Sequence, residues 1–228
     1  MIIPEEKIFN NKVFVLNPNL NVESVETKYS KIFIIDDFYK NYDFVLNEIE
    51  KLPITKVLGD PRNNIDFIDG RKVYSPNMMG TSLPYQETLL RLMSRIVEHP
   101  KDKITLDTKL LVNCFKFTDR VDFENYYYGI HRDPIHSKRQ VGQVAIVLFL
   151  NKEYQENEGL NFYIDNKVNS SRIRNFFKKS EWQIDYSVQA KPNRAVLFTS
   201  NMYHGQYTGS EQFKTDIRYT QVFFASLW

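Results

Sequence analysis

The feature that most constrains the fold is a series of short β-like segments that begins near residue 105. Roughly eight segments rich in β-branched and aromatic residues follow one another within about 120 residues, with turn residues between them. They read TKLLVNCFKF, FENYYYGIH, QVAIVLFLN, GLNFYID, QIDYSVQA, RAVLFTS, HGQYTG and DIRYTQVFFASLW. Many short strands joined by turns are typical of a sandwich, a jelly roll or a small barrel. The second half of the chain therefore predicts a mainly β fold.

The first half predicts helices that flank this β region. Residues 31–39 (KIFIIDDFY) read as a buried strand, and residues 41–52 and 84–99 carry apolar side chains at helical spacing. Residues 1–30 are polar and could add an edge strand. Pro and Gly break the stretch 55–82, which has no clear period, so we expect a long loop of the kind that often takes part in function.

Composition narrows the class of protein. The 228 residues fit a single domain, and 42% hydrophobic with 14% aromatic content is that of a packed globular protein. The one cysteine, Cys114, excludes an internal disulfide and any cysteine-rich zinc module. No apolar run is long enough for a signal sequence or a membrane span, and 30 basic against 28 acidic residues give no general attraction to nucleic acid or membrane. We expect a cytoplasmic protein.

A basic insertion, residues 167–181, interrupts the β region and includes Arg172 and Arg174. Its simplest interpretation is a solvated helix face. Its place beside the mouth of a predicted barrel also allows the role of a substrate lid.

The segment YYYGIHRDPIHSKRQ raises the question of whether its polar side chains hold a metal. On a strand, His131 and Asp133 point to the same side, while Arg132 points to the other. His136 lies beyond a proline that breaks such a strand, and its simplest interpretation is a loop residue. A His-x-Asp pair arises often by chance and is a weak signal alone. A third metal ligand should therefore come from elsewhere in the chain.

Downstream segments supply the missing groups. NRAVLFTSNMYHGQ predicts a strand, a turn and then His204 at the start of another strand. In TDIRYTQVFF, Arg218 shares a strand face with Thr220, and a guanidinium on an interior face needs an anionic partner. Two histidines and a carboxylate that leave coordination positions open match the facial triad of non-haem Fe(II) oxygenases. A guanidinium can bind the far carboxylate of a small diacid through two parallel hydrogen bonds.

The polar positions occur along the chain in the order His131, Asp133, His204, Arg218 and Thr220. This order resembles the pattern of 2-oxoglutarate- and Fe(II)-dependent oxygenases, in particular the prolyl-hydroxylase-like members. The resemblance covers residues 105–228, and IFIIDDFYKNYDFVLNEI is similar to the N-terminal strand and helix of small members. It implies a double-stranded β-helix, which is a jelly-roll, cupin-like barrel with the metal at its mouth. One oxygenase domain would span residues 1–228, with an N-terminal strand and helix region before the β core.

The resemblance also implies the reaction and the ligands. The implied metal and catalytic residues are His131, Asp133 and His204. The implied 2-oxoglutarate-binding residues are Arg218 and Thr220, with Tyr128 and Asn113 as further candidates. Such an enzyme uses Fe(II), 2-oxoglutarate as co-substrate and O₂, hydroxylates a second substrate, here unidentified, and releases succinate and CO₂. Members that halogenate have a small residue in place of the aspartate, so Asp133 argues for hydroxylation.

The chain departs from the family pattern at two positions near core strands. The common Gly-Gly pair of the fourth core strand is Gly159 followed by Leu160, and Asn193 and Arg194 replace the glycine that often precedes the sixth strand. Two alternatives stay open: a cupin-like metalloprotein that does not use 2-oxoglutarate, and a catalytically silent barrel that serves as a binding module. Arg218 argues against the first alternative, because such a protein needs no buried cation opposite the metal. An intact set of inward polar groups argues against the second, because burying them costs free energy. His99, at the end of the second helix, is expected at the surface.

Overall fold

The computed structural model describes residues 15–51, 55–56, 67–73, 83–106, 111–117, 125–133, 140–164, 176–208 and 216–228. The backbone alone is described for residues 55–56, 67–73, 83–86 and 111–117 and for Tyr126, Tyr128, Phe176 and Thr208.

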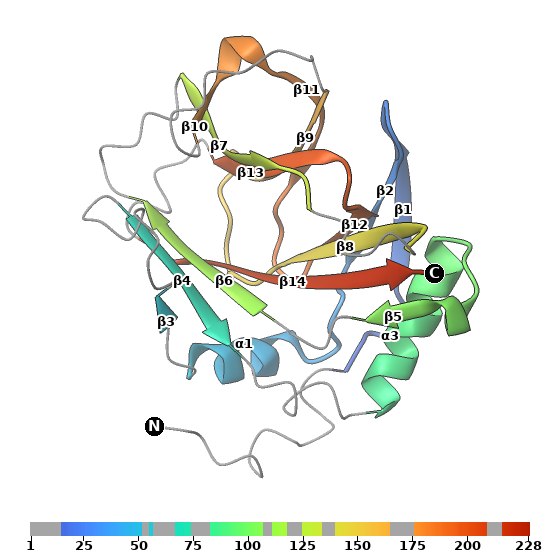
Figure 1. Ribbon diagram of the computed structural model, residues 1–228. Helices are drawn as coiled ribbons and strands as arrows, with labels where there is room; N and C mark the ends of the chain where they lie inside the picture. The colour runs from blue at the N-terminus through green and yellow to red at the C-terminus, as the bar shows by residue number, and fades with distance from the viewer. Residues whose placement is uncertain are drawn as a thin grey trace.

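Strands of the described residues form two antiparallel sheets (Figure 1). The larger sheet runs in the order β1 (Asn21–Glu26), β2 (Lys31–Asp36), β12 (Ala195–Thr199), β8 (Gly142–Phe149), β14 (Arg218–Leu227), β6 (Leu111–Phe117), β4 (Phe67–Val73) and β3 (Thr55–Lys56), and β5 (Ile104–Leu106) also pairs with β14. The smaller sheet runs in the order β10 (Phe176–Lys178), β7 (Tyr126–His131), β13 (Tyr203–Thr208), β9 (Glu158–Ile164) and β11 (Gln183–Gln189).

The path of the chain between the sheets defines the fold. The strands β6, β8, β12 and β14 lie side by side in the larger sheet, and β7, β9, β11 and β13 belong to the smaller one. The chain therefore crosses between the sheets at every step along these eight strands except from β9 to β11. This winding of antiparallel strands around one axis is a jelly roll of the double-stranded β-helix type. The predicted mainly β fold with flanking helices is confirmed.

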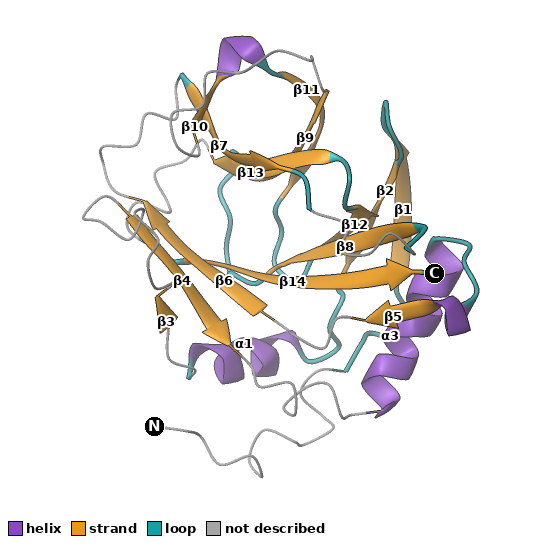
Figure 2. Cartoon of the chain, viewed as in Figure 1, coloured by secondary structure: helices purple, strands orange, loops and turns teal. Residues whose placement is uncertain are grey.

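Two helices cover the face of the larger sheet that points away from the smaller sheet (Figure 2). They are α1 (Tyr42–Glu50) and α3 (Leu83–Ile96), which confirms both helix predictions, and short 3-10 turns follow at η2 (Lys101–Lys103) and η3 (Lys179–Glu181). No helix among the described residues is both long and apolar enough to cross a lipid bilayer.

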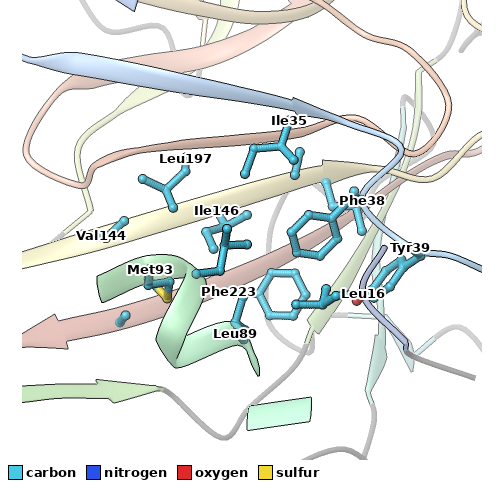
Figure 3. Close-up of a cluster of buried hydrophobic side chains, with 14 of the residues drawn as sticks. Leu16, Ile35, Phe38, Tyr39, Leu89, Met93, Val144, Ile146, Leu197 and Phe223 are labelled. Carbon is cyan, nitrogen blue, oxygen red and sulfur yellow. The ribbon is translucent and has the colours of Figure 1, made fainter. Parts of the chain in front are cut away.

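The helices pack because their apolar side chains recur at helical spacing. Figure 3 shows Leu89 and Met93 of α3 pointing toward Ile146 of β8 and Phe223 of β14. All four side chains are at least 98% buried. Burying such a side chain contributes about 1.5–3 kcal/mol before the cost of ordering it. The helices thus close one side of the larger sheet and leave its other side to face the barrel interior.

A second apolar cluster fills the space between the two sheets. Phe162 of β9 and Phe198 of β12 are fully buried there, with ring centroids 5.0 Å apart in an edge-to-face arrangement. Because side chains alternate along a strand, Glu158 and Leu160 lie on the same interior face as Phe162. Gly159 lets β9 approach β11, since a Cβ atom at this position would lie 2.0 Å from the Val188 carbonyl oxygen.

The structure overturns two predictions about the irregular segments. The stretch 55–82 contains β3 and β4, and β4 pairs with β6 from Phe67 opposite Phe117 to Val73 opposite Leu111. The sequence of β4, FIDGRKV, lacks an apolar alternation, because this strand forms by adding to the edge of β6. The rest of that stretch lies outside the described residues.

The described end of the basic insertion is β structure and a 3-10 turn, so the helix predicted there is wrong for residues 176–181. Phe177 is buried in a cluster with Tyr163 and Trp182, on the face of the smaller sheet away from the barrel interior. Figure 2 shows this sheet curled into a ring that η3 closes between β10 and β11. Packing of Phe177 against the neighbouring aromatic side chains favours the extended conformation of this segment. Arg172 and Arg174 lie outside the described residues.

Candidate metal centre

Two histidines meet on neighbouring strands of the smaller sheet. His131 ends β7 and is directly opposite His204 of β13, and their ring centroids are 4.3 Å apart. Asp133 follows two residues after His131, and its backbone N–H donates to the Ser200 carbonyl at 2.9 Å. Ser200 follows β12, so this bond holds the Asp133 segment against the end of a strand from the other sheet. Antiparallel pairing and one backbone bond therefore bring three potential ligands to one point.

The potential ligand atoms converge. The Nε2 atom of His131 lies 3.6 Å from Oδ1 of Asp133, and Nε2 of His204 lies 3.5 Å from Oδ2 of the same carboxylate. All the ligand atoms of these three residues lie within 4.8 Å of one another. A single ion placed among them could contact two neutral imidazoles and a carboxylate, the donor set that suits Fe(II) and other divalent metals.

Backbone carbonyls orient both imidazoles. Nδ1 of His131 lies 2.6 Å from the Gly129 carbonyl, and Nδ1 of His204 lies 2.9 Å from the Met202 carbonyl. A carbonyl only accepts, so each Nδ1 must carry the hydrogen and donate it. Each Nε2 then keeps a lone pair on the side of Asp133, as metal-binding histidines require.

Gly129 makes this arrangement possible on β7. Its φ of +71° lies in the left-handed region, and the pairing of β7 with β13 shifts register at this point. The residues opposite Gln206 and His204 are consequently Tyr128 and His131, which are three positions apart. This bulge aims the Gly129 carbonyl at the His131 ring.

The three side chains differ in how far they are exposed to solvent. The two histidines also differ in pKa. The side chain of His204 is 5% exposed, that of Asp133 13% and that of His131 53%. Burial, assisted by the nearby His131, lowers the pKa of His204 to about 4, which keeps this imidazole neutral at neutral pH. Loss of hydration opposes protonation of His131, but the hydrogen bond and charge of Asp133 outweigh it and raise the His131 pKa. His131 is also the most exposed of the three side chains, so the cluster is open to solvent on its side.

Arg218 lies inside the barrel. It is 3% exposed and begins β14 on the face whose later residues, Val222 and Phe224, pack against the interior cluster. Its Nη2 donates to the Gly159 carbonyl of β9 at 3.2 Å, so the side chain crosses from the larger sheet to the smaller one. Its Nε atom has no hydrogen-bond partner within the described structure. Burial lowers the pKa of Arg218 from its ordinary value, while nearby Tyr154 and Glu158 oppose that change.

Other predicted residues fall in different places. Thr220 is buried two residues after Arg218. The backbone of Asn113 pairs with Thr220 and that of Tyr128 with Gln206, but both side chains lie outside the described part of the chain, as does His136. His99 is half-buried, and its Nε2 lies 3.2 Å from the Trp228 carbonyl, away from the cluster.

Two interior polar residues were missed from sequence. Gln206 is 9% exposed, and its Nε2 has no hydrogen-bond partner within the described structure. Glu158 is fully buried. Alternation from His204 along β13 would have placed Gln206 on the interior face. Glu158 carried no signal, because it is the first residue of β9 and the next residues on its face, Leu160 and Phe162, are apolar.

Comparison with known proteins supports the fold. No protein-family model matches the chain, and no curated protein matches it. Among solved structures, EvdO2 from Micromonospora carbonacea var. aurantiaca is 11% identical with a TM-score of 0.53, and the match covers 86% of each chain.

Two further matches have lower TM-scores. HygX from Streptomyces hygroscopicus, with nickel, 2-oxoglutarate and hygromycin B bound, is 14% identical with a TM-score of 0.48, covering 86% of this chain and 82% of that one. An oxidoreductase of the 2OG-Fe(II) oxygenase family from Burkholderia pseudomallei is 14% identical with a TM-score of 0.46, covering 86% and 84%. The chain thus shares its fold with EvdO2, and its structural neighbours include members of the 2OG-Fe(II) oxygenase family.

Proposed function

We propose that this chain is a non-haem Fe(II) oxygenase that uses 2-oxoglutarate and hydroxylates a second substrate. The proposal rests mainly on one observation, which is that a candidate metal site and a buried guanidinium occur in the same barrel. One ligand atom from each of His131, Asp133 and His204 lies within 4.8 Å of the others, and the buried Arg218 lies between the same two sheets with a donor that has no partner among the described residues.

The residues present fit a divalent metal. Both imidazoles are held with Nε2 available, and one carboxylate faces both of them. His131, Asp133 and His204 would hold one Fe(II), which leaves positions for a chelating co-substrate and O₂. When bound, the iron supplies the oxidising chemistry that converts 2-oxoglutarate and O₂ to succinate and CO₂ and oxygenates the second substrate.

The interior residues fit the far carboxylate of 2-oxoglutarate. Arg218 offers Nε and its terminal nitrogens, and a guanidinium binds a carboxylate through two parallel hydrogen bonds. Gln206 offers its Nε2 from the facing sheet, and Thr220 could donate its hydroxyl. A diacid would therefore satisfy two donors, on Arg218 and Gln206, for which the described part of the chain offers no partner; a buried donor left without one costs free energy. The chain's contribution is to orient the diacid and to keep water from its far end.

The same features weigh against the alternatives. A cupin-like metalloprotein without 2-oxoglutarate has no use for a buried guanidinium whose Nε has no partner in the part of the chain that the structure describes. A silent binding barrel does not need two imidazoles held in the tautomer that suits a metal.

Arg218→Ala tests the proposal. Truncating one member of a buried charge-assisted pair typically costs about 2–5 kcal/mol, so 2-oxoglutarate affinity should fall by roughly 30-fold or more. Metal affinity should change little. Arg218→Lys should recover only part of the loss, because an ammonium lacks the fork of donors. The measurement is titration of the charge-transfer absorption of the anaerobic Fe(II) complex with 2-oxoglutarate.

Arg95→Ala is the matched control, because Arg95 is exposed on α3 and should leave the affinity unchanged. An unchanged affinity in Arg218→Ala, or no absorption band in the wild type, would overturn the proposal and favour the cupin-like alternative.

A further inference from the structure

A buried carboxylate lies beside the proposed co-substrate pocket. Glu158 is the first residue of β9 and is 0% exposed. By alternation it shares the interior face of β9 with Leu160, which belongs to the cluster between the two sheets. The next residue, Gly159, accepts the hydrogen bond from Nη2 of Arg218 at 3.2 Å. The guanidinium therefore lies against the Gly159 carbonyl, one residue after Glu158.

Glu158 and Arg218 interact through space. A fully buried carboxylate is costly unless positive charge or hydrogen bonds compensate it, and the charge of the buried Arg218 contributes to that compensation. Arg218 nevertheless makes no direct ion pair with a carboxylate of the described residues, and its Nε stays without a hydrogen-bond partner. The two charges thus stabilise each other, while the donors of the guanidinium stay available to a ligand.

We infer that Glu158 sets the affinity of the pocket for diacids, by repelling the far carboxylate that Arg218 attracts. The inference rests on the proposed function. A ligand carboxylate at Arg218 must enter a region of low dielectric that already holds one negative charge, so the attraction to Arg218 is partly cancelled. Glu158 is in this sense a specificity-determining residue that acts through Arg218.

The same repulsion should act on the product. Succinate keeps the carboxylate that Arg218 would bind, so a carboxylate beside Arg218 weakens the hold on co-substrate and co-product together. Its effect is to speed release of succinate and to limit product inhibition.

The test is Glu158→Gln, which removes the charge and keeps the shape of the side chain. The dissociation constants of 2-oxoglutarate and succinate, measured by calorimetry on the metal-loaded protein, should each fall about tenfold, because a like charge close to the ligand is removed in a partly dry site. Metal affinity should not change. Glu156→Gln is the matched control, since Glu156 is exposed in the turn just before β9 and should leave all three constants unchanged.

A second arm separates repulsion from a structural effect. In an Arg218→Met background, Glu158→Gln should change binding of the amide analogue 2-oxoglutaramate by less than twofold, because that ligand has no charge at its far end. In the wild-type background the same substitution should raise the preference for 2-oxoglutarate over 2-oxoglutaramate about tenfold, since only the diacid is repelled.

Unchanged or weaker 2-oxoglutarate binding in Glu158→Gln would overturn the inference. If that variant does not fold, Glu158→Met is measured in the same way, and failure of both variants to fold would assign Glu158 a structural role instead. The proposed function fails separately, when the wild-type protein does not bind 2-oxoglutarate at all. If the wild type binds it and Arg218→Ala weakens binding while Glu158→Gln has no effect, the inference alone is wrong.

Discussion

Single residues hold the candidate metal centre together through their backbones more than through their side chains. The Gly129 and Met202 carbonyls fix the tautomers of the two imidazoles, and the N–H of Asp133 is tied to Ser200. Each bond lies at a strand end or a bulge, where backbone N–H and C=O groups are not used in pairing with a neighbouring strand. The geometry of the site is therefore a property of the fold, and a substitution that removes one ligand should leave the barrel intact.

His204→Ala should lower the affinity for a divalent metal by about a hundredfold or more, because it removes one of the three proposed protein ligands. Ni(II) and Zn(II) can stand in for Fe(II) in the titration, since such sites accept the commoner divalent metals in vitro. His99→Ala is the control, because the His99 ring contacts the Trp228 carbonyl away from the cluster. Calorimetric titration of both variants checks this, and an equal loss in His99→Ala would show that the ligands are wrongly assigned.

Residues predicted from sequence were those whose neighbours form a strong pattern. Alternation of side chains along a strand placed His131 and Asp133 on the same side of their segment, and Arg218 and Thr220 on the same face of theirs. This alternation applies wherever a strand is regular. Asn193 shows why a departure from a pattern can be harmless. Its φ of +60° lies in the left-handed region, which asparagine tolerates better than most residues, and its side chain bonds both the N–H and the carbonyl of Tyr39.

At the scale of elements, local sequence predicts those that carry their own hydrophobic pattern. Both helices and the buried strands of the core were predicted, since their apolar spacing matches a helix or a strand. The strands β4 and β10 were missed because each depends on a partner far away in sequence, β6 for the first and β7 for the second. Tertiary pairing overrides weak local preference in such segments.

The contact between β9 and β11 also depends on one residue. Gly159→Ala should destabilise the protein by about 3 kcal/mol, because the new methyl would lie 2.0 Å from the Val188 carbonyl oxygen and must push the strands apart. Gly142→Ala is the matched control, since its methyl would lie 3.4 Å from Cδ1 of Leu227, an ordinary contact. The free energy of unfolding in urea measures both. Equal stability of the two variants would show that β9 and β11 can separate without cost.

At the scale of the whole molecule, the N-terminal strands are part of the barrel wall. The strand β2 pairs with β12, and β12 pairs with β8 of the core. A charged contact joins the same parts, because the Arg194 guanidinium donates from Nε to Oδ1 of Asp36 at 2.5 Å and from Nη2 to Oδ2 at 2.8 Å. Arg194 also donates to the Gln189 carbonyl at the end of β11. One side chain therefore links β2 of the larger sheet to β11 of the smaller sheet.

This contact should make stability depend on pH. The hydrogen bond to Arg194 is the main cause that lowers the pKa of Asp36 below its ordinary value, and burial opposes it. A lowered pKa in the folded state means that the stabilisation is present above the unfolded value, about pH 3.9, and is lost as the pH falls below it. Because the Asp36 side chain is 45% exposed, screening by water should limit the contribution to about 1 kcal/mol.

Asp36→Asn should therefore lower the free energy of unfolding by about 1 kcal/mol between pH 6 and 8, and the difference from the wild type should diminish as the pH falls below about 3.9. Thermal melting of both proteins across this range is the measurement. Glu26→Gln is the control, because Glu26 pairs with Lys31 at 3.1 Å with both side chains mostly exposed, and it should change stability little at any pH. A deficit in Asp36→Asn that stays the same as the pH falls would mean that Asp36 acts through shape rather than charge. In that case β2 would be held to the core by its ladder with β12 alone.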